Sequence, residues 1–269
     1  MTISTRDQLL AAAKQRIRLI KTAAATTVAT IPFSTFDLAG APGAGSLAIG
    51  NITAGLVPTD ADAGYPVINA FGGGNAGILS SVEFGNSVAC RATLYDRVYH
   101  VGSVPLTALA TTNFSSQPSF AARLPGTDYT NLEFFLEINV AVSATATTVA
   151  VGYTRDDGTA GRTTGATASL SGFTTRRLVL LNLQAGDKGL QKIESVTVGG
   201  TVASAGSVNV VVARRLWSNR MKAANDGGLD GPDKTGTPPV YETSALWLVI
   251  EADGTSSGVP EITATIANG

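Results

Sequence analysis

Residues 147–170 read TTVAVGYTRDDGTAGRTTGATASL, and this stretch decides the fold class. From Val149 to Tyr153, apolar residues occupy every second position, which is the pattern of a strand with one buried face. The pair Asp157-Gly158 follows, and such a pair between two strand-like runs is a strong signal for a two-residue hairpin turn. The residues after the turn run back to Leu170. The stretch therefore predicts an antiparallel β-hairpin.

Similar runs continue to the end of the chain, separated by turns rich in Gly, Asp and Asn. Short strands at a spacing of about 8–12 residues are typical of a β-sandwich or barrel. The other predicted strands are Val88–Val101, Leu132–Val140, Arg176–Leu183, Ile193–Val198, Ser207–Leu216, Ala245–Ala252 and Glu261–Ala267. Alternating strand and helix patterns are absent, which argues against a parallel α/β sheet.

We therefore predict an all-β protein with an antiparallel, jelly-roll-like β-sandwich over residues 87–269. Within it, residues 217–244 form a polar excursion with Gly-Gly, Gly-Pro and Pro-Pro pairs. Long excursions between strands are usually functional or irregular.

The first 86 residues are predicted to form a separate region, an amino-terminal helix followed by a loop-rich arm. Ser4 and Asp7 match a capping box, and we expect a helix over 5–21. Its apolar stripe would consist of Leu9, Leu10, Ala13, Ile17 and Ile20. Short strand-like pieces are expected at 31–38, 47–52 and 65–71.

Composition gives a second indication of function. Charged residues make up only 14% of the 269 residues, and the chain contains 30 Gly. Since a charged share of about a quarter is usual, small and polar side chains must cover much of the surface. Such side chains lose little entropy when they become immobilised, so this surface suits extensive protein contact. A soluble β-domain with many turns would have a similar composition.

Residues 1–21 carry five basic residues and one acidic residue, whereas the rest of the chain is acidic. The single cysteine, Cys90, excludes an intrachain disulfide. The opening MTISTRD shows no apolar core of a secretory signal, and no run of about 18 apolar residues is present. We expect synthesis in a reducing host cytoplasm and no membrane partner.

Catalytic and metal-binding constellations are sparse. His100 is the only histidine, no G-x-S-x-G motif surrounds a serine, and one Cys with one His cannot form the usual zinc site. Asp226, Asp230 and Asp233 do not match a calcium-binding EF-hand loop. We interpret them as a solvated acidic loop. Whether this loop binds a cation is left open.

Other motifs are equally weak. Residues 72–77 satisfy G-x-G-x-x-G, but no strand-to-helix context surrounds them. Glu133 and Glu137 would share one strand face, as would Glu251 and Asp253, yet such spacings are common on solvent-facing strands. We predict no catalytic residue, no cofactor, no metal site and no enzymatic activity.

Four segments carry a family resemblance: MTISTRDQLLAA at the start, FSTFDLAGAPGAG at 33–45, LYDRVYHVG at 94–102 and SVTVGGTVASAGSVNVVVARRL at 195–216. In this order they resemble a family of tailed-bacteriophage virion structural proteins. The resemblance implies a capsid decoration (cement) protein. Such proteins are often trimers that sit on the outer shell and tie neighbouring capsid subunits together.

This resemblance implies a location in the virion. It also implies that the partners are the major capsid protein, other virion proteins and further copies of the chain in a homotrimer. No nucleic-acid partner is expected. The basic amino-terminal segment is the predicted contact. We expect Leu9, Leu10, Ile17 and Ile20 to dock on a neighbour. Arg16, Arg18 and Lys21 would meet an acidic capsid surface.

Four alternatives stay open. The chain could be a neck or tail component, or a receptor- or carbohydrate-binding β-sandwich with aromatic residues exposed on one face. A hydrolase using Glu133 or Glu137 is the third. In the fourth, the amino-terminal helix packs on its own sandwich and contacts no partner.

Overall fold

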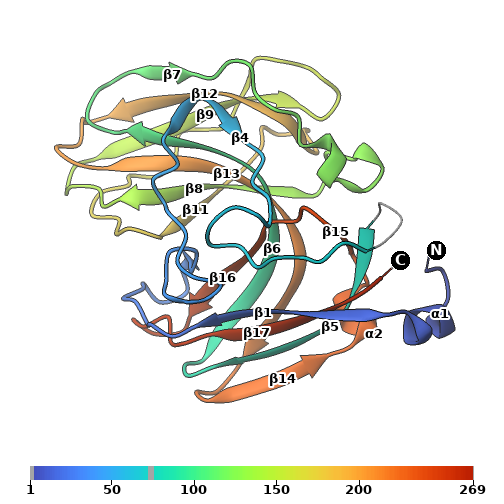
Figure 1. The fold of residues 1–269 in the computed structure, drawn as a ribbon. Helices are drawn as coiled ribbons and strands as arrows, with labels where there is room; N and C mark the ends of the chain where they lie inside the picture. The colour runs from blue at the N-terminus through green and yellow to red at the C-terminus, as the bar shows by residue number, and fades with distance from the viewer. Residues whose placement is uncertain (1–2, 72–75, 269) are drawn as a thin grey trace. The chain divides into compact units, whose positions relative to one another are not determined.

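The structure, a computed structural model, describes residues 3–71 and 76–268. It is built almost entirely from antiparallel strands, which confirms the all-β prediction (Figure 1). The chain divides into two compact units that are interleaved along the sequence. Unit 1 comprises residues 1–46, 59–96 and 215–269, and unit 2 comprises residues 47–58 and 97–214.

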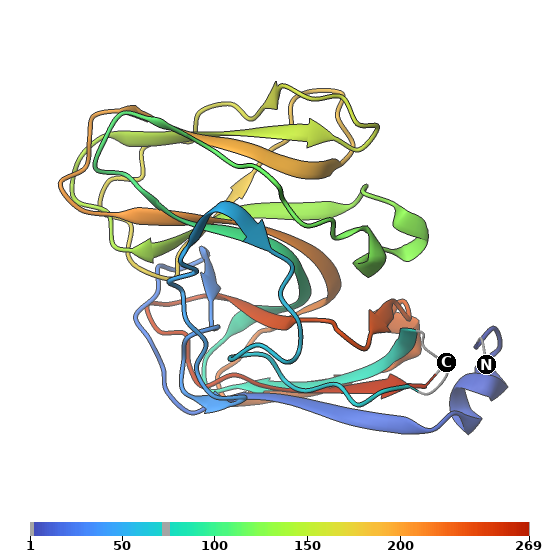
Figure 2. The same cartoon turned by 45° about the horizontal axis from the view of Figure 1, so that its top comes forward.

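Unit 1 contains a six-stranded sheet ordered β14-β5-β17-β1-β3, with β15 also paired to β5. These strands are β1 (Lys14–Lys21), β3 (Gly40–Ala41), β5 (Ala76–Asn86), β14 (Asp226–Asp230), β15 (Pro239–Tyr241) and β17 (Glu261–Ala267). The unit also holds β2 (Pro32–Ser34), β16 (Leu246–Ala252), α1 (Arg6–Ala11) and α2 (Pro232–Thr235). Figure 2 shows β1 and β17 running side by side, and their register pairs Arg18 with Thr263.

The core of unit 1 lies on one face of this sheet. Ile17 and Leu19 of β1 and Ile262 of β17 are buried there. They pack with apolar side chains from β16 and from the first half of β6 (Cys90–Pro105), such as Leu94 and Leu248. Cys90 itself is fully buried in this core.

Unit 2 contains a four-stranded sheet ordered β10-β9-β12-β7. Its other strands pair as β11-β8-β13, and a large apolar core includes side chains from β8, β9, β12 and β13. The bounds are β4 (Asn51–Leu56), β7 (Thr111–Asn113), β8 (Leu132–Val140), β9 (Thr147–Arg155), β10 (Arg162–Thr163), β11 (Leu178–Leu181), β12 (Leu190–Gly200) and β13 (Ser207–Met221). Two short 3-10 helices, η1 (Ala121–Arg123) and η2 (Pro125–Thr127), complete the unit.

The predicted antiparallel hairpin is present, but its turn is not of the two-residue type. Arg155 N donates to the Thr159 carbonyl and Gly158 N to the Arg155 carbonyl, so three residues form the turn. β9 and β10 pair with Tyr153 opposite Arg162, and Gly158 supplies the positive φ of 88° that the turn requires. The return strand is shorter than expected because it ends at Thr163. Beyond it, the amide nitrogens of Thr164 and Thr167 still donate hydrogen bonds to β9 carbonyls.

The expected helix over residues 5–21 is wrong in its extent. α1 ends at Ala11, and residues 14–21 form β1. Its capping box uses Thr5 and Gln8 in place of Ser4 and Asp7: the Gln8 amide donates to Thr5 Oγ1 at 3.2 Å, and the Thr5 amide donates to Gln8 Oε1 at 3.1 Å. Pairing of β1 with β17 supplies hydrogen-bond partners for the backbone N–H and C=O groups that a helix would have paired internally.

Two further expectations change. Residues 65–71 form no strand, although Tyr65, Ile68 and Phe71 are buried. Residues 217–244 are only partly an irregular excursion, because they include the end of β13, then β14, α2 and β15. β14 and β15 extend the six-stranded sheet by pairing with β5.

Candidate functional site

The seven residues predicted to contact a partner all lie in unit 1, but they do not share one face. Leu9 is buried beneath α1, whereas Leu10 keeps 64% of its surface exposed. In β1, alternate residues point to opposite faces of the sheet. Ile17 and Lys21 are buried on the core side, while Arg16, Arg18 and Ile20 lie on the outer side. The predicted single apolar stripe is therefore absent.

Lys21 illustrates how firmly β1 is built into its unit. Its Nζ donates a hydrogen bond of 3.1 Å to the Leu38 carbonyl, and only 3% of the residue is exposed. Burial lowers the pKa of Lys21 to about 8, an effect partly offset by Asp37. This ammonium is thus turned away from any partner surface.

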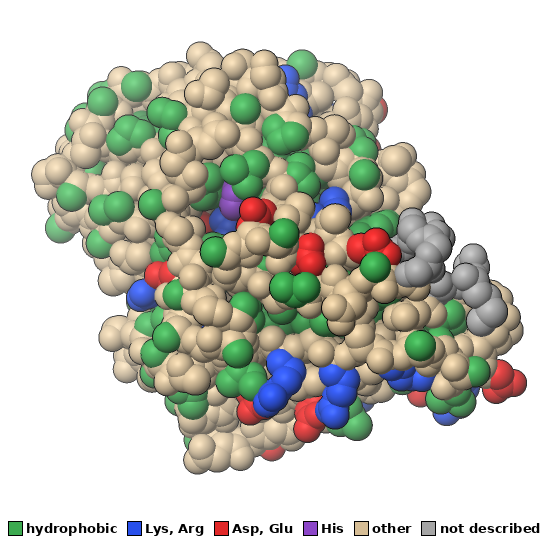
Figure 3. Space-filling view, in the orientation of Figure 1, with side chains coloured by type: hydrophobic (Ala, Val, Ile, Leu, Met, Phe, Trp, Pro, Cys, Tyr) green, Lys and Arg blue, Asp and Glu red, His purple; other side chains and the backbone are tan. Residues whose placement is uncertain are grey.

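Arg16 and Arg18 are exposed but already have partners within the chain. Arg16 Nη2 lies 3.0 Å from Glu83 Oε2 on β5, and Arg18 Nη2 lies 3.4 Å from Glu261 Oε1 on β17. Figure 3 shows basic and acidic side chains next to one another in the lower part of the view. The outer face of the sheet therefore presents both signs of charge in place of the basic patch that the sequence predicted.

A shallow hollow of about 190 Å³ opens on the same face. Its lining residues are Glu83, Phe84, Gly85, Glu261 and Thr263. Gly85 forms the floor because it has no side chain. A Cβ at this position would meet no atom closer than 3.6 Å, so the space above it is open.

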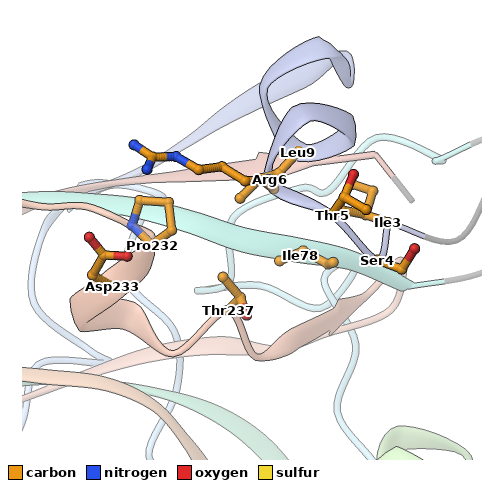
Figure 4. A pocket seen from close by; sticks show the side chains of 9 residues that line it. All are labelled: Ile3, Ser4, Thr5, Arg6, Leu9, Ile78, Pro232, Asp233 and Thr237. Carbon is orange, nitrogen blue, oxygen red and sulfur yellow. The ribbon is translucent and has the colours of Figure 1, made fainter.

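A larger pocket of about 380 Å³ lies between α1 and α2 (Figure 4). Residues from the amino-terminal segment form one wall, α2 and its following loop form the other, and Ile78 of β5 lies between them. The lining combines apolar Ile3, Leu9 and Pro232 with charged Arg6 and Asp233. Its position beside the exposed Leu10 makes this end of unit 1 a second candidate contact.

The residues considered for catalysis are engaged in structural contacts. Glu137 is fully buried in unit 2, where its Oε2 accepts hydrogen bonds from Arg97 Nη2 at 2.7 Å and from Asn209 Nδ2 at 3.1 Å. It therefore does not form a solvent-facing carboxylate pair with Glu133. Glu251 faces Arg91 and Asp253 faces Arg220.

His100 is 7% exposed, and burial together with the nearby Arg97 cation holds the pKa of His100 well below its usual value. No hydrogen bond joins its side chain to a serine or cysteine within residues 3–71 and 76–268. A neutral, buried imidazole of this kind has no nucleophile to activate.

Within the described residues, no three His, Cys, Asp or Glu side chains are grouped so that they could hold a metal ion. Asp230 instead accepts hydrogen bonds from Trp217 Nε1 at 2.9 Å and Asn219 Nδ2 at 2.6 Å. These contacts and Lys234 hold the pKa of Asp230 below its usual range despite the opposing effect of burial. Most of the glycine-rich motif at 72–77 lies outside the described residues.

Sequence reasoning missed the buried polar group formed by Arg97, Glu137 and Asn209. Asn209 Nδ2 also donates to the Leu47 carbonyl at 2.8 Å. The available signal was polar residues at core positions of β6, β8 and β13. No described helix is long and apolar enough to cross a membrane.

Comparisons with known proteins add little. No family model and no curated protein sequence matches the chain. Among solved structures, the infectious bursal disease virus VP2 subviral particle aligns over 95% of this chain and 81% of that chain, with 13% identity and a TM-score of 0.20. The Gx strain of the same virus aligns over 95% and 80%, with 10% identity and a TM-score of 0.18. At such TM-scores the backbones do not correspond, so no fold or function is transferred.

Proposed function

We propose that the chain is a structural component of a tailed-phage particle, and specifically a capsid decoration protein. It would bind the outer shell, tie neighbouring capsid subunits together and have no enzymatic activity. The observation that carries the proposal is an all-β body in which one exposed sheet face carries short, uncharged side chains. On the outer face of the four-stranded sheet of unit 2, Ala150 and Gly152 of β9 lie beside Thr197 and Ser195 of β12.

These short, uncharged side chains support a role in adhesion. They lose little conformational entropy on burial, and depletion of charge is the compositional mark of interface cores. Four segments of the chain resemble, in the same order, segments of tailed-phage virion proteins. This resemblance supports a location in the phage particle. Many copies on one particle would make individually weak contacts effective through high local concentration.

The alternatives receive less support. A carbohydrate- or receptor-binding face needs exposed aromatic residues, but Trp217 and Trp247 are 3% and 1% exposed. None of the strongly exposed large apolar side chains in the described ranges is aromatic. A hydrolase would need an accessible carboxylate pair, whereas Glu137 is buried against Arg97. A neck or tail component would differ from a decoration protein only in where it lies on the particle.

The decisive experiment is imaging of purified particles that carry the tagged protein. We expect label over the capsid surface at many equivalent positions. Label confined to the neck or tail would replace the decoration role with the alternative. Absence of the protein from purified particles would overturn the proposal.

A mutational test can use Leu10, which is exposed beside the α1 pocket. Deleting residues 1–21 is unsuitable, since it would remove β1 from its sheet. We expect Leu10→Asp to reduce particle binding, whereas Val67→Asp, at 68% exposure in the same unit, leaves binding unchanged. Equal binding by both variants would exclude Leu10 from the contact.

A further inference from the structure

The outer face of the sheet in unit 1 has a regular arrangement of rows. Cross-strand pairing aligns Arg18 of β1 with Thr263 of β17, and Thr263 with Glu83 of β5. The next row aligns Ile20, Glu261 and Gly85. β17 thus lies midway between a strand that carries exposed arginines and a strand that carries a glutamate and a glycine.

Charge on this face is balanced and ordered. The side chains of Arg16 and Arg18 are 67% and 62% exposed, and those of Glu83 and Glu261 are 60% and 53% exposed. A uniformly acidic or uniformly basic partner would meet attraction on one strand and repulsion on the next. A partner with the mirrored order, acidic opposite β1 and basic opposite β5, complements the charges on both strands that flank β17.

Shape follows the same order. The hollow above Gly85 lies in the row of Ile20, whose side chain is only partly buried on the outer face of β1. Gly227 of β14 continues this row beyond Gly85, so no side chain closes the hollow from that side. The face therefore carries one apolar projection and one matching depression, on opposite sides of β17.

We propose that this face binds a second copy of the chain about a two-fold axis that runs along β17. Such an axis places β1 of one copy over β5 of the other and keeps each row on the same row. Arg18 then meets Glu83 of the partner copy, and Ile20 enters the hollow above Gly85 of the partner copy. The two Glu261 carboxylates approach near the axis, each accompanied by its own Arg18.

The contact is small. The axis along β17 brings three strands of each copy, β1, β17 and β5, against one another. At about 4.8 Å spacing and about seven residues of roughly 3.3 Å, they give a face of about 14 by 23 Å. The pair of copies would bury roughly 650 Å² in total, below the usual range for specific interfaces. Association in solution should therefore be weak, and stronger where copies are held close together.

The test is sedimentation equilibrium of the full-length protein over a concentration series reaching about 1 mM. We expect R18E and E83R each to weaken dimerisation tenfold or more. The double variant R18E/E83R should return to within about threefold of wild type, because it re-forms the pair between copies. Within one chain, Arg18 pairs with Glu261 and Arg16 with Glu83, so the swap restores no intrachain pair.

Shape is tested separately by Gly85→Leu. The open space above Gly85 accommodates a side chain, so this variant should fold normally, as judged by circular dichroism, while the hollow is filled. We expect at least tenfold weaker dimerisation. Val67→Leu, on an exposed position of the same unit, is the matched control.

A protein that stays monomeric throughout the series, or a dimer that R18E/E83R fails to restore, overturns the proposal. Because the experiment needs no particle, its result is independent of the proposed virion role. A two-fold contact closes at two copies, so the trimer expected from the resemblance would require a different surface.

Discussion

The buried ion pair between Arg97 and Glu137 gives the sharpest prediction for stability. The two side chains are 1% and 0% exposed, their closest atoms are 2.7 Å apart, and Asn209 donates to the same carboxylate oxygen. Replacing Glu137 by Gln keeps the shape of the side chain but removes its charge. The Arg97 cation then loses the buried carboxylate oxygen that lies 2.7 Å from its Nη2.

The expected cost follows from burial. Removing one partner of a buried pair typically destabilises a protein by about 3–5 kcal/mol, because the remaining charge is poorly solvated. An exposed pair is worth about 0–1 kcal/mol. Asp253→Asn, which removes the 2.9 Å contact with the half-exposed Arg220, is therefore the matched control. Replacing both buried partners, in R97M/E137L, should recover most of the loss, since apolar replacement of a buried pair is often nearly neutral.

Urea unfolding followed by far-UV circular dichroism measures these free energies. Both tryptophans, Trp217 and Trp247, lie in unit 1, so their fluorescence reports on the unit that Glu137 does not occupy. Hydrogen exchange of β8 and β13 amides gives the local value in unit 2. A loss for E137Q no larger than that for D253N would refute the reasoning.

Three further predictions concern single sites. The pKa of Asp230 is depressed in the folded state, so its contribution is present above the unfolded pKa of about 4 and is lost as pH falls through the folded value; D230N should weaken this acid dependence in urea titrations at pH 2–6. Lys21 has a pKa of about 8 in the folded protein, against about 10.4 in the unfolded chain. Between these values the unfolded chain binds more protons, so the free energy of unfolding should rise with pH across that window. In K21M this rise should be absent from urea titrations at pH 7–10.5. Gly158 and Gly200 both have positive φ, but a Cβ meets open space at Gly158 and lies 2.2 Å from the Ala146 carbonyl oxygen at Gly200. G158A should cost about 1 kcal/mol, and G200A should lower the thermal midpoint several times further.

The parts of the fold that were predicted best from the sequence have a strong local pattern of apolar residues. The predicted bounds of Leu132–Val140 and Glu261–Ala267 agree with β8 and β17. The position of the hairpin turn at Asp157-Gly158 also follows from local chemistry, although the turn has three residues in place of the predicted two. β9 alternates, with Val149, Val151 and Tyr153 buried, whereas β8 is a continuous apolar run whose middle is buried on both faces. Both patterns are local, so no distant partner had to be known.

The helix predicted over residues 14–21 was wrong because the local pattern there is ambiguous. Ile17 and Ile20 lie three apart and fit a helical stripe, but Ile17, Leu19 and Lys21 also fit a strand with period two. The choice is made by β17, whose residues follow more than 200 positions later in the chain. Local propensity is a weak prior when a tertiary partner of this kind exists.

The candidate site could be predicted even less than the fold. The hollow depends on Gly85, one of 30 glycines, and becomes visible only when β17 and β14 flank it. Likewise, polar residues at core positions such as Asn209 indicate a buried network only when the strands beside them are known.

The basic amino-terminal segment carries the main lesson about partners. Counted along the chain, its arginines predict an acidic docking surface. In the sheet, Arg16 and Arg18 lie next to glutamates from β5 and β17, so the positive charge of the two arginines is balanced by carboxylates of the same chain. What a partner meets is then the order of charges across β1, β17 and β5, which a count of charges along one segment does not contain. An ordered, neutral face favours a partner with the same order reversed, and a second copy turned about β17 has that order by symmetry.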